Sequence, residues 1–364
     1  MSDFDKFLRN VNIPDVLMGR RGVIDNYRSF EAERAAMLAL LENHMYGKMP
    51  KRPVHLKVEP ISIDRGFAAG RATLSRFMIH AECEDGTVSF PFYSAIPNVN
   101  RRKPPVIIHL KDTPDIPDRS EPTEELTDNG FAVFGICASD VVPRNDDFRR
   151  GNAKVLVASR RSPASSGKLA MWAWAAMRVI DYVETLTELD TKNLGITGLG
   201  ILGGAVLLAS AYDERIKYAA PVCAGTCADA LIRVGNGDRF SDIIKREAYL
   251  FCPKFGDYAW HEEKLPFDQH FLLSLIAPRR ILILAAEGDY RSCPKSQFAS
   301  LCLADRVYKL YGLDAIPQVN EFPKTPIKVE GHCMFSLRSG LRYFARDDWH
   351  TIMKFIKKRS EKAR

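Results

Sequence analysis

The chain has 364 residues, of which 46% are hydrophobic and 27% charged, and this composition is typical of a globular protein large enough for one α/β domain. Its formal net charge is +7 and its pI is about 8.9. The excess of Lys and Arg is spread along the chain without a basic arm, heptads or a nucleic-acid motif, which argues against nucleic-acid binding. It is compatible with a weak preference for anionic ligands.

The first residues, MSDFDKFLRNVN, contain no apolar core of a secretory signal, and no apolar run reaches the length of a membrane span. The eight cysteines are scattered, with no C-x-x-C pair and no zinc spacing. We therefore expect a cytoplasmic protein with reduced thiols, no metal, no cofactor and no membrane contact. The oligomeric state is left open.

Taken in chain order, the sequence predicts an N-terminal arm over 1–29 and a single α/β domain over 30–364. Apolar positions at helical spacing predict helices, and apolar or alternating runs predict strands. The predicted helices are 30–44, 169–185, 205–211 and 347–358. The predicted strands are 54–60, 72–82, 87–93, 105–110, 131–137, 193–197, 218–223 and 280–286. Alternating strands and helices favour a mostly parallel, doubly wound sheet with an antiparallel N-terminal extension. The helical and aromatic stretch 229–270 is expected to form a cap.

One strand–turn–helix carries most of the functional information. The strand 193–197 leads into a glycine-rich turn at 198–204, and a helix follows. An α/β-hydrolase carries its G-x-S-x-G nucleophile at such a turn. In this chain that frame reads Gly198-Leu199-Gly200-Ile201-Leu202, so a glycine stands where the serine nucleophile is expected. Glycine adopts the strained backbone angles of this turn without penalty.

The same letters also form G-x-G-x-x-G, the dinucleotide-binding pattern. That pattern requires an acidic residue about 20 positions later, at the end of the next strand. The next predicted strand ends in Val222-Cys223-Ala224-Gly225, which contains no carboxylate. Roughly 190 residues also precede the motif, whereas a dinucleotide fold usually opens with it. Dinucleotide binding is retained as a minor alternative.

Several longer motifs resemble those of bacterial glucuronoyl esterases and the related acetyl xylan esterases. This resemblance runs from about residue 30 to 360 and implies an α/β-hydrolase fold and carbohydrate-ester chemistry. The matching segments are HMYGKMP (44–50), AWAAMRVIDYVET (173–185), DERI (213–216), LPFDQH (265–270), LIAPR (275–279) and the stretch 338–349.

The sequence departs from the family pattern at the positions that the resemblance assigns to catalysis and sugar binding. The resemblance implies G-H-S-R-x-G-K at the turn, so Leu199 replaces His, Gly200 replaces the nucleophilic Ser and Ile201 replaces Arg, while Gly204 replaces a sugar-binding Lys. In the family's histidine loop, Arg342 stands where the general base is expected. An arginine cannot accept a proton at neutral pH. A carboxylate of some relatives aligns near Cys223, and a sugar-packing aromatic near Leu250.

These substitutions predict a catalytically degenerate homologue that binds a small anionic or carbohydrate-like ligand or serves as a partner subunit. The expected pocket residues are Leu199, Gly200, Ile201, Cys223, Asp289, Arg338 and Arg342. Asp289 is the candidate relic acid, free to pair with Arg291 or Arg342. The alternative is an active hydrolase that uses relocated residues, with Cys223, His332 and Cys333 as candidates beside Asp289.

Overall fold

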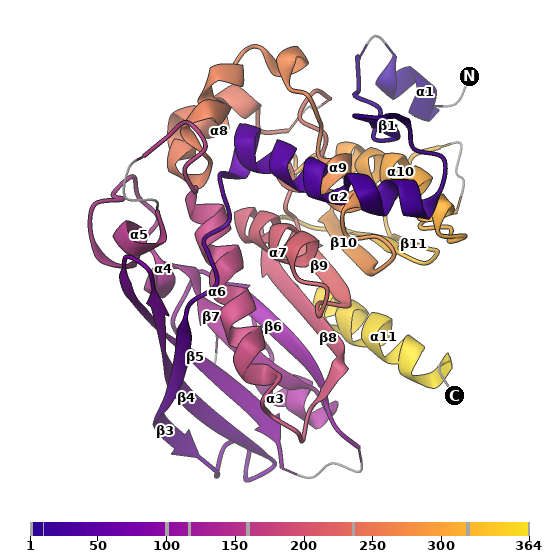
Figure 1. Cartoon of the computed structure of the whole chain (residues 1–364). Coiled ribbons are helices and arrows are strands. Elements are labelled where there is room, and N and C mark those ends of the chain that lie inside the picture. Colours follow the sequence, from indigo (N-terminus) through magenta and orange to yellow (C-terminus); the bar gives the residue numbers. More distant parts are fainter. Residues whose placement is uncertain are drawn as a thin grey trace.

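The computed structural model describes residues 3–9, 11–98, 102–115, 118–157, 161–234, 237–317 and 321–362. Its centre is a ten-stranded sheet in the order β11-β12-β10-β9-β8-β6-β7-β5-β4-β3 (Figure 1). The strands are β3 (His55–Asp64), β4 (Ala72–Cys83), β5 (Gly86–Pro97), β6 (Pro105–Lys111), β7 (Ala132–Cys137), β8 (Asp190–Leu199), β9 (Tyr218–Val222), β10 (Arg280–Ala286), β11 (Ile327–Glu330) and β12 (Met334–Arg338).

The run from β12 to β7 is parallel, whereas β11 and the N-terminal strands β3–β5 pair antiparallel. The predicted α/β-hydrolase architecture with an antiparallel extension is thus confirmed. Parallel strands are buried on both faces, which explains the continuous apolar runs that revealed them. Their carboxyl ends meet at one edge of the sheet, where ligands of such folds bind. The sequence did not predict β11 or β12.

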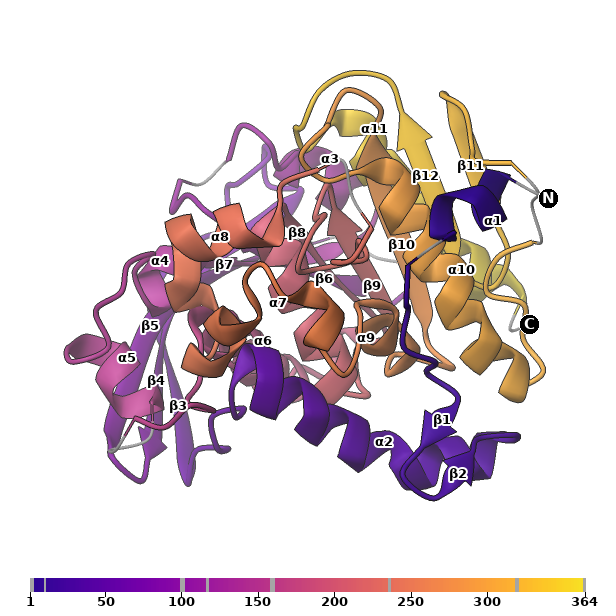
Figure 2. The same cartoon turned by 90° about the horizontal axis from the view of Figure 1, so that it is seen from above.

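Helices cover both faces of the sheet (Figures 1 and 2). They are α2 (Tyr27–Leu41), α3 (Thr123–Asp128), α4 (Ala138–Val141), α5 (Gly151–Leu156), α6 (Lys168–Val183), α7 (Ile201–Tyr212), α8 (Phe240–Glu247), α9 (His270–Ser274), α10 (Pro294–Leu310) and α11 (Arg346–Lys362). One layer contains α6, α7, α9, α10 and α2, and its side chains share the large core with the sheet. The opposite face is covered by α3 and α11 around Phe131 and Trp349.

The N-terminal arm is more regular than predicted. It contains α1 (Asp3–Leu8) and a two-stranded ribbon of β1 (Met18–Gly19) and β2 (Gly22–Val23), and Figure 2 shows it lying beside α10. The predicted cap over 229–270 contains α8, three short 3-10 turns and the start of α9, with 235–236 outside the described residues. The described part of the chain contains no helix long and apolar enough to cross a membrane.

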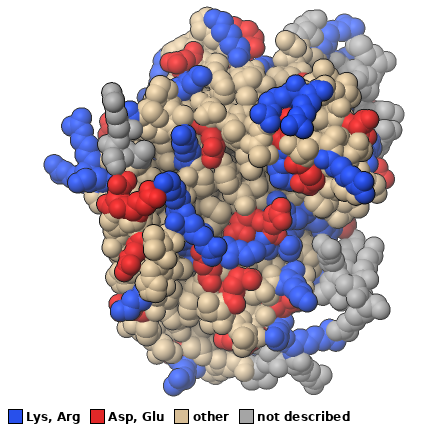
Figure 3. Space-filling view, in the orientation of Figure 1, with Lys and Arg blue, Asp and Glu red and all other residues tan. Residues whose placement is uncertain are grey.

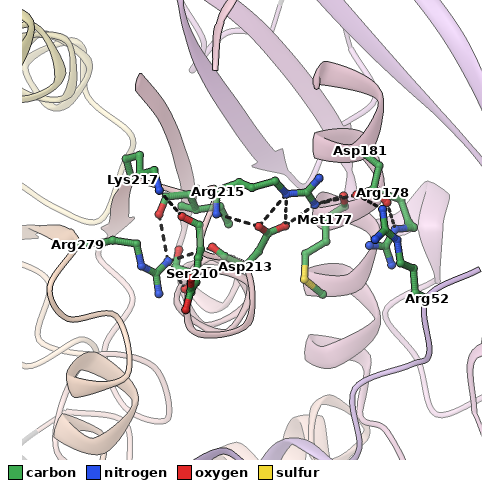
Figure 4. Close-up of polar contacts among 11 residues, drawn as sticks. Arg52, Met177, Arg178, Asp181, Ser210, Asp213, Arg215, Lys217 and Arg279 are labelled. Atoms are coloured by element: carbon green, nitrogen blue, oxygen red, sulfur yellow. Dashed lines mark hydrogen bonds and ion pairs between the residues drawn. The ribbon is translucent and has the colours of Figure 1, made fainter. Parts of the chain in front are cut away.

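Two of the family-like motifs have structural explanations. Arg279, from LIAPR, is buried and donates hydrogen bonds to the carbonyl oxygens of Ser210, Asp213 and Ile216, at the end of α7 and in the turn after it (Figure 4). Arg215, from DERI, forms ion pairs with Asp213 and with Asp181 on α6, at 2.6 and 2.7 Å. These contacts satisfy the last carbonyl groups of α7 and tie it to α6. They therefore hold the helix that begins at the glycine turn.

Candidate active site

The turn after β8 has the geometry of a nucleophile elbow. Gly200 sits between β8 and α7 with φ 63° and ψ −128°, a conformation that is strained for any residue with a Cβ. Its N–H donates to the carbonyl oxygen of Val222 at 2.8 Å, which fixes the turn to β9. Leu199 and Ile201 flank it, both partly buried against the two cores. The N–H of Ile201 is one of the first of α7 and has no acceptor within the helix.

Arg342 lies directly over this elbow. A Cβ built on Gly200 would collide with the terminal nitrogen Nη2 of the Arg342 guanidinium. Arg342 belongs to the loop after β12, is exposed, and forms no ion pair within the described ranges. The backbone of this loop is held by Gly288, whose N–H donates to the carbonyl oxygen of Gly340 at 2.9 Å. The elbow, the acid loop and the Arg342 loop are therefore contiguous.

Asp289 brings an unpaired carboxylate oxygen to the same region. It is 2% exposed, and its Oδ2 atom has no hydrogen-bond partner. The expected pairing with Arg291 is wrong, because Arg291 instead pairs with Asp238 at 2.8 Å. Among the ion pairs of the described residues, none joins Asp289 to Arg342. A buried acceptor without a partner is costly, so this oxygen is a candidate acceptor at the site.

Cys223 lies between these charged groups. It follows β9 with φ 47° and is fully buried. Burial, together with the negative charge of Asp289, raises the pKa of its thiol to about 12, although Arg338 and Arg342 act in the opposite direction. Such a thiol is protonated at neutral pH, with roughly one part in 10⁵ as the reactive thiolate. The environment therefore disfavours Cys223 as a nucleophile.

Arg338 organises the loop rather than facing an open pocket. Its Nε atom contacts both carboxylate oxygens of Asp348, at 3.1 and 3.0 Å. Its other nitrogens donate to the carbonyl oxygens of Ser339, Leu341 and Tyr343. This set of bonds shapes the backbone on either side of Arg342.

The relocated Cys–His pair considered from the sequence is not formed. His332 and Cys333 precede β12, whereas Cys223 follows β9, and the two strands run parallel through β10. The groups therefore lie at opposite edges of the sheet. Cys333 is fully buried, and His332 contacts the carbonyl oxygen of Pro278 at 2.8 Å. Across the described ranges, no group of three His, Cys, Asp or Glu side chains could hold a metal ion.

The glycines of the turn serve close packing, and the Arg342 guanidinium occupies the approach to Gly200 that a dinucleotide would need. A Cβ on Gly203 would lie 2.6 Å from the Cβ of Ala224, and one on Gly198 would lie 3.1 Å from the carbonyl oxygen of Leu110. These glycines let α7 pack closely against its neighbours, while the Arg342 guanidinium covers the turn at Gly200.

A buried polar network near the site was not predicted. His109 Nδ1 contacts Glu121 Oε2 at 2.5 Å, and Tyr93 donates to the same carboxylate. The His109 ring meets the stacked rings of Phe344 and Trp349 edge-on, at 5.4 and 5.1 Å. His109 thus supports the segment that follows Arg342. In the sequence, the only sign of this polar network is a histidine inside the otherwise apolar strand PVIIHLK.

Comparison with known proteins identifies the family. A family model described as fungal glucuronyl esterase matches residues 79–312. A carbohydrate esterase from an unknown prokaryotic organism is 32% identical over 189 residues, covering 52% of this chain and 44% of that protein. A 4-O-methyl-glucuronoyl methylesterase from Cerrena unicolor is 23% identical over 314 residues, covering 84% of this chain and 63% of that protein. The chain thus spans about half to two thirds of the length of these relatives.

Among solved structures, the glucuronoyl esterase from Solibacter usitatus superposes with a TM-score of 0.85 at 26% identity, covering 95% of this chain and 97% of that one. A promiscuous esterase from a marine bacterial metagenome gives a TM-score of 0.87 at 23% identity, covering 98% and 99%, which shows the shared fold.

These comparisons correct the main functional prediction. The non-catalytic binder was inferred from the combined substitution of the nucleophile, the base and the family's Arg and Lys positions, but the matching family and the named relatives are esterases, and the alternative of an active hydrolase agrees better with them. The prediction failed for a physical reason. The loss of the serine excludes an acyl-serine intermediate, but it does not exclude ester hydrolysis by another route. The matched region extends over well more than half of the sequence. The chain belongs to the glucuronoyl esterase family.

Proposed function

We propose that the protein hydrolyses carboxylic esters of uronic-acid sugars and that it does so without an acyl-serine intermediate. The observation that carries this proposal is the presence, in adjoining loops, of an exposed Arg342 guanidinium over the elbow and of a buried, unpartnered Oδ2 on Asp289. Together they provide a fixed positive charge and a proton acceptor beside the helix N-terminus. The substrate class comes from the relatives named above, one of which is the 4-O-methyl-glucuronoyl methylesterase from Cerrena unicolor.

The triad of the family is degenerate in this proposal. Gly200 offers no nucleophilic oxygen, and Arg342 stays protonated, so neither half of a serine–histidine pair is present. The remaining route is direct attack by water. The N–H of Ile201 and the Arg342 guanidinium are the donors that would stabilise the negative charge on the ester carbonyl oxygen.

Asp289 is the general base. A water molecule hydrogen-bonded to Oδ2 transfers a proton to the carboxylate as its oxygen attacks the ester carbon. The tetrahedral intermediate then collapses, the C–O bond to the alcohol breaks, and the protonated Asp289 returns the proton to the leaving alkoxide. The products are the uronic acid and the alcohol. Cys223 is not used, because its thiol is protonated at working pH.

The test is hydrolysis of a methyl ester of glucuronic acid by the purified chain, before and after treatment with a fluorophosphonate. Activity without a serine nucleophile should persist after treatment, whereas contaminating serine esterases are removed. Asp289→Asn should lower kcat by about 10²-fold or more, because the general base is lost. Glu287→Gln, an exposed carboxylate two positions away, is the matched control and should retain activity. Loss of all hydrolysis on fluorophosphonate treatment would contradict the mechanism.

A further inference from the structure

A hollow on the surface, separate from the elbow, has no part in the reaction proposed above. It has a volume of about 860 Å³ and is formed by the segment after β7, by α5 and by Arg161. This is within the size range of small-ligand sites. Figure 3 shows Lys and Arg side chains projecting from the edge of the molecule where Figure 1 draws α5.

Four cations line this hollow, namely Arg149, Arg150, Lys154 and Arg161. All four are exposed, and within the described ranges none of their side chains forms an ion pair. Partial burial lowers the pKa of the Arg161 guanidinium, and no carboxylate counteracts this shift. Unpaired cations gathered in a concave surface repel one another and attract an anion.

The hollow is lined by an aromatic ring that contacts two cations, one of which, Lys168, lies behind the ring and outside the hollow. The Phe148 ring is buried, with the Arg161 guanidinium carbon 4.1 Å and the Lys168 ammonium nitrogen 4.8 Å from its centroid. Lys168 is completely buried and donates to the carbonyl oxygens of Pro143 and Asp147 at 2.9 and 3.0 Å. These bonds hold the backbone of the segment that precedes Arg149 and Arg150.

Acidic groups share the same surface. Asp85, Asp146 and Asp147 line the hollow together with the four cations. Such a mixture suits a ligand that combines carboxylates with hydroxyl groups, because carboxylates bind the guanidinium forks and hydroxyls donate to the aspartates. It suits a phosphate backbone less well, since that ligand offers a dense row of negative charges and fewer donors.

The hollow also lies along the same sheet edge as the elbow. The strand order β8-β6-β7-β5 separates β8 from β7 by two strand spacings and from β5 by three, or about 10–15 Å. The hollow follows the carboxyl end of β7, and α5 is anchored on β5 by Asn152, whose side chain donates to the carbonyl oxygen of Ser89 at 2.7 Å. The elbow and the hollow therefore lie towards the same end of the parallel strands.

We propose that this hollow binds a de-esterified uronic acid unit of the polysaccharide whose esters are hydrolysed at the elbow. This inference rests on the proposed function for the identity of the polymer. Each turnover exposes a carboxylate, and a site for that carboxylate retains the enzyme on the same chain. Retention of this kind raises the effective concentration of the remaining esters without any new contact at the elbow.

The test uses an oligogalacturonate without ester groups, titrated calorimetrically into the full chain, so that binding is measured whether or not any ester is hydrolysed. Arg150→Gln/Arg161→Gln should weaken binding by about tenfold or more, since two charge-assisted contacts are lost. The control Arg65→Gln/Lys192→Gln removes two exposed cations elsewhere and should change affinity less than about twofold. Both variants should hydrolyse a methyl glucuronate monosaccharide like the wild type.

Three results would overturn the proposal. Equal weakening in the control pair would indicate a non-specific effect of net charge. Equal affinity for a neutral xylo-oligosaccharide would show that carboxylates are not recognised. Binding of duplex DNA as tightly as the oligogalacturonate, at the same salt concentration, would indicate a general polyanion surface. A further result separates the two proposals: the wild type binds oligogalacturonate, and loses that binding in Arg150→Gln/Arg161→Gln, while hydrolysing no ester. That result would refute the proposed function and support this site.

Discussion

Gly200→Ala separates the two reasons why glycine occupies the elbow. The backbone there has φ 63°, and a Cβ would also collide with Arg342 Nη2. The backbone strain should cost about 1–2 kcal/mol of the free energy of unfolding. The collision should add little, because Arg342 is an exposed side chain without an ion pair among the described residues and can rotate away.

Urea denaturation of matched variants tests this division. Gly130→Ala has φ 79° with open space around the new Cβ, so it should lose a similar amount from backbone strain alone. Gly204→Ala lies inside α7 with ordinary contacts at 3.5 Å or more, and should be neutral or slightly stabilising. The double variant Gly200→Ala/Arg342→Ala should be no more stable than Gly200→Ala. Full recovery in the double variant, or no loss in Gly200→Ala, would refute the reasoning.

Three further predictions concern buried groups. Cys223 should resist iodoacetamide at pH 8 in the folded protein, because its pKa is raised to about 12, and rapid modification located by mass spectrometry would contradict its burial. Burial lowers the pKa of His270 to about 3 in the folded protein, whereas its value in the unfolded state is about 6.5. Between these two pH values only the unfolded state binds the proton. The free energy of unfolding should therefore fall by up to about 1.4 kcal/mol per pH unit as the pH drops from 6.5 towards 3. Replacing His270 by Gln should flatten that slope in denaturation curves measured between pH 7 and 4.5, and an unchanged slope would show that other groups cause it. Arg279→Met should lower the free energy of unfolding by about 2–4 kcal/mol, because three buried carbonyl groups lose their donor, and a loss below 1 kcal/mol would show that water replaces it.

Much of the architecture could be predicted from the sequence because the parallel strands are buried on both faces. Runs such as PVIIHL and ILILAA read as strands without further information. By contrast, β12 carries the mixed run MFSLR and was missed. Its place is fixed by pairing with β10, a non-local contact that no local pattern reveals.

The candidate site could be predicted only in part. The glycine turn and Asp289 were found because they follow recognisable strands, and Arg342 was found through the family-like loop. The unpaired Oδ2 of Asp289 could not be foreseen, since Arg291 seemed an equally near partner in sequence. His332 and Cys223 are far apart because β12 and β9 run parallel, and His332 precedes β12 whereas Cys223 follows β9. A local sequence pattern does not show this. The functional error came from equating the loss of the family's catalytic and binding residues with the loss of the reaction.

The central claim is that ester hydrolysis at this site uses Asp289 and water rather than a serine. The most direct measurement is the rate of methyl glucuronate hydrolysis by fluorophosphonate-treated wild type, Glu287→Gln and Asp289→Asn proteins side by side. Saturable turnover is expected in the first two, and a loss of about 10²-fold or more in Asp289→Asn. Wild-type turnover no greater than that of heat-inactivated protein, or equal rates in all three proteins, would contradict it.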